Sequence, residues 1–327
     1  MRHPPHRRTI RRTSAPALPF SWAQAGWLTI ARVPPVSTLL TTVTLDPAAL
    51  ALALIAAVLY GVGLRSASRR GERWPLWRTL SFYVFGIAAY LVLTCGFTGA
   101  YGRELRWAFT LKLALVFFVI PPLAGLGRPL SLARAALADR GRERLDRIMG
   151  SRPMRILGNA FIAPILGLAF FGTFLTPLLY TYRADAVVSG ILSVAVPLLG
   201  LLLALPITEA EGFQRTSSFI MLEFVYVFIE LLADAVPGIA LRLNDNVLDR
   251  VTQWSAGAPS WFPSPIRDQQ LAGDLLWFIA EIVDLPLIIL MFVRFSRSDR
   301  REARSFDELT DEEMDALSEA HLRRRGE

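Results

Sequence analysis

Long apolar runs alternate with short polar connections along most of the chain. Seven of these runs reach the length of about 20 mostly apolar residues that a bilayer-spanning helix needs. They are Pro47–Leu64, Thr79–Gly102, Leu105–Gly127, Ile156–Tyr182, Ala186–Thr208, Ser217–Leu241 and Gln270–Val293. In hydrocarbon the backbone groups must be satisfied within the segment, so runs of this length are helical. The pattern predicts an all-α membrane protein, a bundle of seven transmembrane helices.

Arginine is distributed unevenly among the connections between these runs. The connections after the first and third runs and the tail after the seventh are rich in arginine, whereas those on the opposite side carry one arginine each or arginines matched by aspartates. Cytoplasmic loops carry an excess of basic residues. We therefore predict a multi-pass protein of the plasma membrane, with the N-terminus outside and the C-terminus in the cytoplasm.

The chain divides into three parts. Residues 1–33 are basic and lack the apolar stretch of a signal peptide, so they are predicted to be a disordered segment. Residues 34–304 form the seven-helix membrane domain. Residues 305–327 form a cytoplasmic tail with a short helix, because Thr310 and Glu313 have the spacing of a capping box.

Two connections have patterns of their own. In Pro129–Met149, leucines alternate with arginines and acids, which suits either a short interfacial helix or a solvated loop. In the outer loop Val247–Gln269, Trp254, Trp261 and Phe262 stand beside prolines. We expect these aromatic side chains to form a cap over the mouth of the bundle.

Composition restricts the chemistry. The chain is 53% hydrophobic and only 19% charged, and its net charge of +7 comes from arginines between apolar runs, so its partner is the lipid bilayer and not nucleic acid. The three histidines, His3, His6 and His321, all lie in the terminal segments, so no apolar run offers an imidazole to a metal. The single cysteine, Cys95, cannot form an intramolecular disulfide. No nucleotide-binding or hydrolase motif occurs, so neither an enzyme nor a bound cofactor is predicted.

Charged residues inside three of the predicted spans define a candidate polar site. Inserting each one costs roughly 2.5–3.5 kcal/mol, and such residues usually face a functional interior. The candidate site comprises Lys112, Glu230, Asp234, Asp274, Glu281 and Asp284. The carboxyls form a stripe on each of two helices. Two interpretations remain open: a functional site between the helices, or protonated side chains that only hydrogen-bond to each other or to the backbone.

Lys112 is the only lysine in the chain and lies deep in the third run. Its predicted depth from the outer end matches that of Asp234, about 12–13 Å at the rise of an α-helix. We therefore expect Asp234 to hold the ammonium, with Glu230 or Asp274 as a second partner, since an unpaired buried ammonium is costly. The alternative is a lysine that extends to the outer interface unpaired.

The end of the last run resembles a known family. Asp268-Gln269-Gln270-Leu271-Ala272-Gly273, then Trp277 and Glu281-Ile282, and after the span Ser296-Arg297-Ser298-Asp299-Arg300-Arg301, are similar to the end of the CtaG-type cytochrome c oxidase assembly family. The resemblance covers about Pro34 to Arg304. It implies seven helices and a role in maturation of the copper centre of haem-copper oxidases.

The resemblance also implies where metal ligands would stand. The family's histidines fall at Phe109, Leu113 and about Asp234, so the scaffold is kept and the imidazoles are lost. We therefore expect a non-enzymatic protein that acts in or beside oxidase assembly, with respiratory oxidase subunits as partners and no direct copper ligation. The alternative is a proton- or cation-coupled transporter that uses the intramembrane carboxylates. The sequence indicates no oligomeric state.

Overall fold

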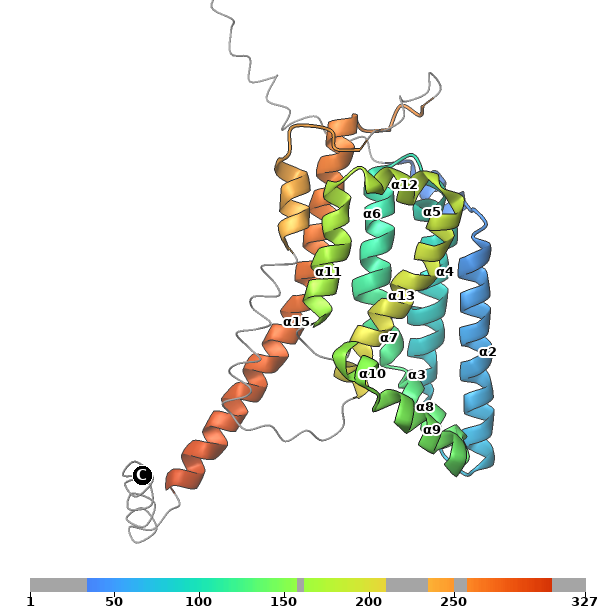
Figure 1. Cartoon of the computed structure of the whole chain (residues 1–327), viewed down its shortest axis with the longest axis vertical. Coiled ribbons are helices and arrows are strands. Elements are labelled where there is room, and N and C mark those ends of the chain that lie inside the picture. The colour runs from blue at the N-terminus through green and yellow to red at the C-terminus, as the bar shows by residue number, and fades with distance from the viewer. Residues whose placement is uncertain (1–33, 158–161, 210–234, 250–257, 308–327) are drawn as a thin grey trace, which may run out of the picture.

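The computed structural model describes residues 34–157, 162–209, 235–249 and 258–307. These residues form a bundle of helices, and no strand occurs among them (Figure 1). The predicted all-helical class is therefore confirmed. The predicted disordered segment 1–33 and the capped helix at Thr310 lie outside the described residues.

Four helices of the described part are long and apolar enough to cross a membrane. They correspond to the first, second, third and fifth predicted runs. Their spans are Pro47–Arg69, Leu76–Tyr101, Arg106–Gly125 and Ala186–Leu205. Asp46 begins the first span, α2 (Pro47–Arg69), by accepting a hydrogen bond of 3.0 Å from the amide of Ala49, as a helix N-cap does.

The second and third spans are each built from several helical segments. The second contains α3 (Leu76–Leu80), the π-helix η2 (Ser81–Ala88), α4 (Ala89–Cys95) and α5 (Phe97–Tyr101). The third contains α6 (Arg106–Ala114), the π-helix η3 (Leu115–Val119) and α7 (Ile120–Gly125). Gly96 separates α4 from α5 with an extended backbone, and a Cβ there would lie 2.3 Å from the carbonyl oxygen of Val92. A residue without a side chain is therefore required at this break.

The fourth predicted run, Ile156–Tyr182, is not one continuous helix. It contains the end of α10 (Arg152–Leu157), then α11 (Ile162–Gly172), the 3-10 helix η4 (Thr173–Leu175) and α12 (Leu178–Ala184). The two halves meet at 89°. Thr176 is extended, as is usual for a residue that precedes proline. The bent pair would be a fifth crossing if it forms one broken span.

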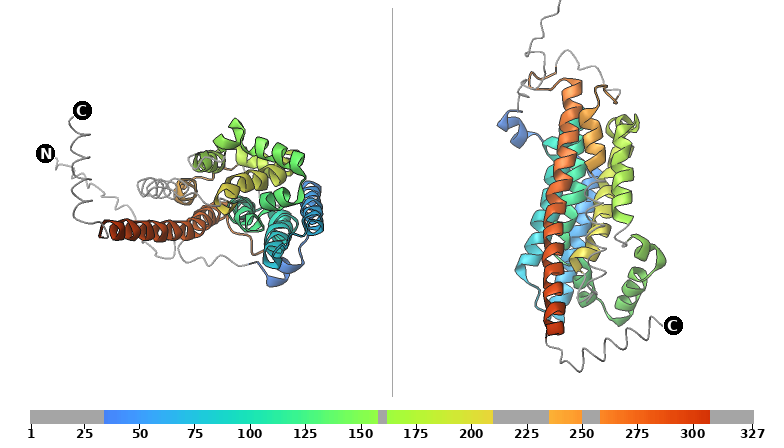
Figure 2. Two further views of the ribbon diagram at one scale, coloured as in Figure 1. Left: turned by 90° about the horizontal axis from the view of Figure 1, so that it is seen from below. Right: turned by 90° about the vertical axis from the view of Figure 1, so that its left-hand side faces the viewer.

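The sixth and seventh predicted runs differ in how many of their residues the structure describes. Most of Ser217–Leu241 lies outside the described residues, and residues 235–243 are helical. The seventh run lies inside α15 (Pro265–Asp307), a single helix of 43 residues. Figures 1 and 2 show that the first half of α15 packs along the bundle and that its second half leaves it. Seven spans are therefore not established by the described residues.

The first half of α15 crosses helix 235–243 at very short range. A Cβ on Gly273 would lie 2.5 Å from the carbonyl oxygen of Gly238, and a Cβ on Gly238 would lie 2.8 Å from that of Gly273. Both distances are too short for a side chain, so the two backbones touch at paired glycines, as in close helix pairs of membrane proteins.

Two helices occupy the connection between the third and fourth runs. They are α8 (Pro129–Ala136) and α9 (Asp139–Met149). The Ser66 hydroxyl donates to the carbonyl of Ala136 (2.7 Å) and the Tyr60 hydroxyl donates to that of Gly127 (2.8 Å). These bonds fasten α8 to the end of α2, so this connection is helical and not a solvated loop.

The core between α6, η3, α11 and α13 (Ala186–Glu209) is rich in phenylalanine. Phe117, Phe171 and Phe174 are buried. The centroids of Phe117 and Phe171 are 5.5 Å apart, and those of Phe171 and Phe174 are 5.3 Å apart, with edge-on geometry. Such pairs add about 0.5–1.5 kcal/mol to the burial of their area, so this cluster fixes the packing of the bent pair on the third span.

Candidate functional site

Asp268, at the start of α15, caps a helix that is distant in the sequence. Its carboxylate accepts hydrogen bonds from the backbone amides of Arg106 (2.8 Å) and Trp107 (3.0 Å), the first two residues of α6. No side chain near the start of α6 caps it locally. Burial raises the pKa of the Asp268 carboxyl, whereas the two amide bonds and the nearby arginines act in the opposite direction. One carboxylate therefore joins α6 to α15 at the end of the bundle remote from α9 (Figure 1).

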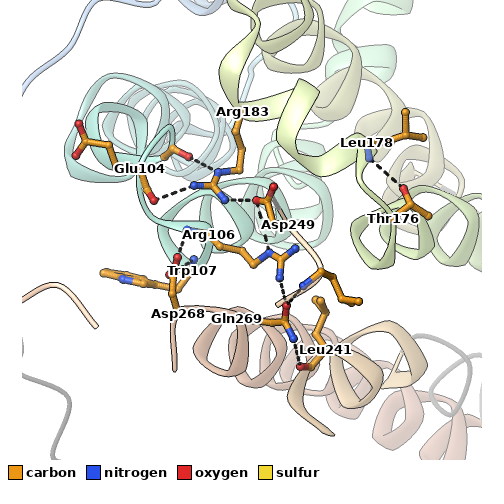
Figure 3. A network of polar contacts seen from close by, with 12 residues as sticks. Glu104, Arg106, Trp107, Thr176, Leu178, Arg183, Leu241, Asp249, Asp268 and Gln269 are labelled. Carbon is orange, nitrogen blue, oxygen red and sulfur yellow. Dashed lines mark hydrogen bonds and ion pairs between the residues drawn. The ribbon is translucent and has the colours of Figure 1, made fainter. Parts of the chain in front are cut away.

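Gln269, next to Asp268, is the second connecting residue. Its side chain is fully buried, and its Oε1 accepts from the guanidinium of Arg106 and from the amide of Leu248 (2.9 Å). Its Nε2 donates to the carbonyls of Asn244 (3.2 Å) and Asn246 (3.0 Å). The amide of Gln269 thus holds the chain that follows helix 235–243 against α6, as Figure 3 shows.

A buried ion pair lies beside these bonds. The guanidinium of Arg183, at the end of α12, donates to Asp249, and the side chains are 3% and 0% exposed. The Nε of Arg106 lies 3.9 Å from the same carboxylate. Arg183 also donates to the carbonyls of Gly102, Arg103 and Glu104, which follow the second span. Four separate parts of the chain meet at this point (Figure 3). We call Arg106, Arg183, Asp249, Asp268 and Gln269 the outer polar network, where outer denotes the end of the bundle remote from α9 (Figure 1).

Aromatic side chains cover the rim of the bundle beside the outer polar network. Trp261 and Phe262 pack on Phe97, Tyr101 and Trp107. The centroids of Trp261 and Tyr101 are 5.3 Å apart, and those of Phe262 and Tyr101 are 5.9 Å apart. The predicted aromatic cap is therefore confirmed for Trp261 and Phe262. Trp254 lies outside the described residues.

A second polar group surrounds the N-terminus of α2. Besides capping that helix, Asp46 accepts a hydrogen bond of 2.6 Å from the hydroxyl of Ser193 in α13, and the carbonyl of Ser193 accepts one of 2.6 Å from Tyr90 in α4. Lys112 is only 5% exposed, and its Nζ lies 5.3 Å from the centroid of Phe109. The Asp46 carboxylate thus joins the start of α2 to α13, whereas the ammonium of Lys112 lies over an aromatic ring.

Three of the six predicted site residues, Lys112, Asp274 and Glu281, have side chains that the structure describes. Lys112 is buried and does not extend to the surface of the bundle. Asp274 is paired with Arg242, with 2.9 Å between Oδ1 and Nε, rather than with Lys112. Glu281 accepts a hydrogen bond of 2.7 Å from the indole of Trp277. Asp284 lies in α15, whereas Glu230 and Asp234 lie outside the described residues, so the predicted pair between Lys112 and Asp234 stays a prediction.

The outer polar network was not predicted as a site. In the sequence, Arg183 stands alone in a short connection, and Asp249 and Asp268 are among the aspartates that match the arginines of a longer loop. One signal pointed to two of its members: Asp268 and Gln269 begin the sequence motif on which the family resemblance depends. The ion pair between Arg183 and Asp249 joins residues 66 positions apart, and no local pattern reports such a pairing.

A copper ion does not fit the positions that the resemblance assigns to the family's histidines. Phe109 and Leu113 are 1% and 2% exposed and belong to the hydrophobic core. Neither carries a donor atom for a metal. No group of three or more histidine, cysteine, aspartate or glutamate side chains with metal-binding geometry occurs among the described residues. Among the described residues, Phe109 and Leu113 therefore contribute to the core and provide no metal site.

The fold and the network define a helical membrane protein, one end of which is held together by buried polar contacts. Comparison with known families identifies it further. The family described as cytochrome c oxidase caa3 assembly factor matches residues 58–298. The chain belongs to this family.

Similar proteins occur in mycobacteria. Uncharacterized proteins of Mycobacterium bovis and Mycobacterium tuberculosis are each 25% identical over 298 residues, which cover 87% of this chain and 45% of the relative. One from Mycobacterium leprae is 24% identical over 264 residues, 77% of this chain and 39% of the relative. The chain thus spans less than half of the length of these relatives. No solved structure matches the chain.

Proposed function

We propose that this protein acts in or beside the assembly of cytochrome c oxidase in the plasma membrane, through contacts with oxidase subunits and not by ligating copper at the family's histidine positions. Membership of the assembly factor family supports the process. One observation supports the mode of action: Phe109 and Leu113 are buried in the hydrophobic core where ligands would stand. A side chain packed in this way contributes to stability and offers nothing to a metal.

The test combines a deletion strain with purification from native membranes. Loss of the protein is expected to lower the amount of assembled oxidase, measured from the haem absorption of membranes, and the intact chain should restore it. The tagged protein should retain oxidase subunits and contain far less than one copper per chain. Normal oxidase content in the deletion strain would contradict the proposed process. Stoichiometric copper that resists chelators would contradict the proposed mode.

Two substitutions make the test sharper. Leu113→Ile keeps the volume of the side chain, adds no donor atom for a metal and is expected to retain assembly. Leu113→Asp places a carboxyl in the core and is expected to abolish both stability and assembly, since an unpaired buried charge is costly. Retained assembly in the first variant and lost assembly in the second would support packing, rather than ligand chemistry, as the role of position 113.

Cation-coupled transport, the alternative, receives no support from the described carboxylates. Asp274 is already paired with Arg242, and Glu281 accepts from Trp277. Cation-dependent flux in proteoliposomes that disappears in a Glu281→Gln variant would revive this function.

We also propose the orientation that the arginine distribution favours, with seven crossings and the C-terminus in the cytoplasm. Reporter fusions after Arg183 and after Arg304 should report opposite sides of the membrane. Fusions that report the same side would contradict this topology.

A further inference from the structure

The helix α9 has a regular arrangement of charges around its axis. At the 3.6-residue period of an α-helix, Leu145, Ile148 and Met149 fall on one face. Arg142 and Arg144 lie at the two edges of that face. The remaining acids and arginines occupy the other side of the helix. An apolar face with arginines at its edges is typical of helices that lie in the plane of a membrane surface.

The packing of α9 leaves this face available. None of its residues is buried, and Ile148 is 55% exposed. Arg134 of α8 pairs with Asp146, with 2.8 Å between Nε and Oδ1. Arg142 donates to the carbonyl of Arg134 (3.2 Å). These contacts hold α9 beside α8 at the lower end of the bundle, oblique to α2 (Figure 1).

The level of α9 can be derived from α2. Ser66, which bonds to the last residue of α8, lies roughly 28 Å along α2 from Pro47 at the rise of an α-helix. The hydrocarbon of a bilayer is about 30 Å thick. Arg65 and Arg69 lie within three residues of Ser66. Arginines at such positions are typical of the membrane boundary. The start of α9 therefore lies at the level of the lipid headgroups.

We propose that α9 is an in-plane anchor that binds the anionic phospholipids of the bilayer in which the chain is embedded. Ile148 and Leu145 enter the boundary between headgroups and acyl chains, and Arg142 and Arg144 bind the phosphates on either side. The occupant is a lipid surface, because the apolar face lies at the level of the bilayer and its two edges carry the charge opposite to that of the phosphates. This inference does not depend on the proposed role in oxidase assembly.

The single native cysteine makes a direct test possible. In the full chain with Cys95→Ser, a cysteine is introduced by Ile148→Cys or, as a control on the opposite side of α9, by Glu143→Cys. Each is labelled with a nitroxide in nanodiscs of phosphatidylcholine, with or without phosphatidylglycerol. Collision rates with oxygen, which concentrates in lipid, and with a soluble nickel chelate are measured from the saturation of the spin signal.

The label at position 148 should be several-fold more protected from nickel in nanodiscs that contain phosphatidylglycerol, and the label at position 143 should remain exposed in both. Arg142→Gln combined with Arg144→Gln should remove most of this protection. Arg140→Gln combined with Arg147→Gln removes the same charge further from the apolar face and should remove less. The comparison of the two lipid compositions with all arginines of α9 in place remains valid if an arginine variant does not fold.

Two results would overturn the proposal. The first is a label at position 148 that nickel reaches as easily as the label at position 143 in anionic nanodiscs. The second is protection that is equal with and without phosphatidylglycerol, which would show burial in lipid or protein without recognition of charge.

Discussion

Replacing Asp249 by asparagine should destabilise the protein more than the same replacement of an aspartate in an exposed ion pair. Asp249 is completely buried, accepts from Arg183 and lies 3.9 Å from the Nε of Arg106. Asp249→Asn keeps the size of the side chain and removes its charge. Two buried guanidinium groups then lose their shared counter-charge and repel each other.

The magnitude follows from these distances. At 3.9 Å and an effective dielectric constant of about 20, two unit charges attract by about 4 kcal/mol. The desolvation of the groups offsets part of this attraction in the intact protein, but the desolvation of the arginines remains when the carboxylate is lost. Breaking a buried pair on one side typically costs about 3–5 kcal/mol. We expect a loss in this range for Asp249→Asn.

The assay is thermal unfolding in detergent, followed by circular dichroism. For a chain of 327 residues, each kcal/mol should lower the midpoint by roughly 1–2 °C. The matched control is Asp146→Asn, because Asp146 pairs with Arg134 through side chains that are 49% and 43% exposed. An exposed pair contributes about 0–1 kcal/mol.

A double variant separates charge from packing. Asp249→Asn combined with Arg183→Gln removes the ion pair and should lose less stability than the sum of the two single changes, since Arg183 no longer stays behind as a second unpaired charge that repels Arg106. Equal losses for Asp249→Asn and Asp146→Asn, or losses that add in the double variant, would refute the assignment of Asp249 as a shared counter-charge.

Two further predictions concern other contacts. Gly273→Ala should lower the unfolding midpoint by several degrees because its Cβ would lie 2.5 Å from a backbone oxygen, whereas Gly172→Ala, with no atom within 4 Å of the added carbon, should leave it unchanged; equal midpoints would contradict the close crossing. Asp46→Ala should cost about 0.5–2 kcal/mol in thermal unfolding, because it removes the N-cap of α2 and the acceptor of the Ser193 hydroxyl; an unchanged midpoint would contradict this capping role.

The parts of the fold that composition dictates were predictable. Four spans lie where long apolar runs predicted them, because hydrocarbon leaves a backbone no alternative to a helix. The 89° bend of the fourth run was not predicted. Prolines in spanning helices usually only kink them. Nothing in the sequence around Pro177 indicates that the backbone of Thr176 is extended and interrupts the helix. Composition determines whether a run is helical but not whether it continues through a proline.

The candidate site was predicted less well, for a physical reason. Intramembrane charges such as Lys112 and Asp274 indicate a candidate site in the sequence, because each is costly to insert. Arg183 and Asp249 carry no such signal, because they stand in connections between apolar runs, where arginines and aspartates are ordinary. Their burial results from tertiary packing of the connections over the bundle. A charge in a loop becomes a buried charge only when another part of the chain covers it.

The outer polar network positions α6 without the imidazoles that the resemblance assigns to this helix. The motif on α15 that carries the resemblance begins with Asp268 and Gln269, and these residues hold the first turn of α6. The same helix bears Phe109 and Leu113, the positions assigned to histidines. Those motif contacts use a carboxylate, an amide and an arginine, and none of them needs a metal. The position of α6 is therefore set independently of any ligand, so its interior face can be repacked with apolar side chains while the helix remains in place.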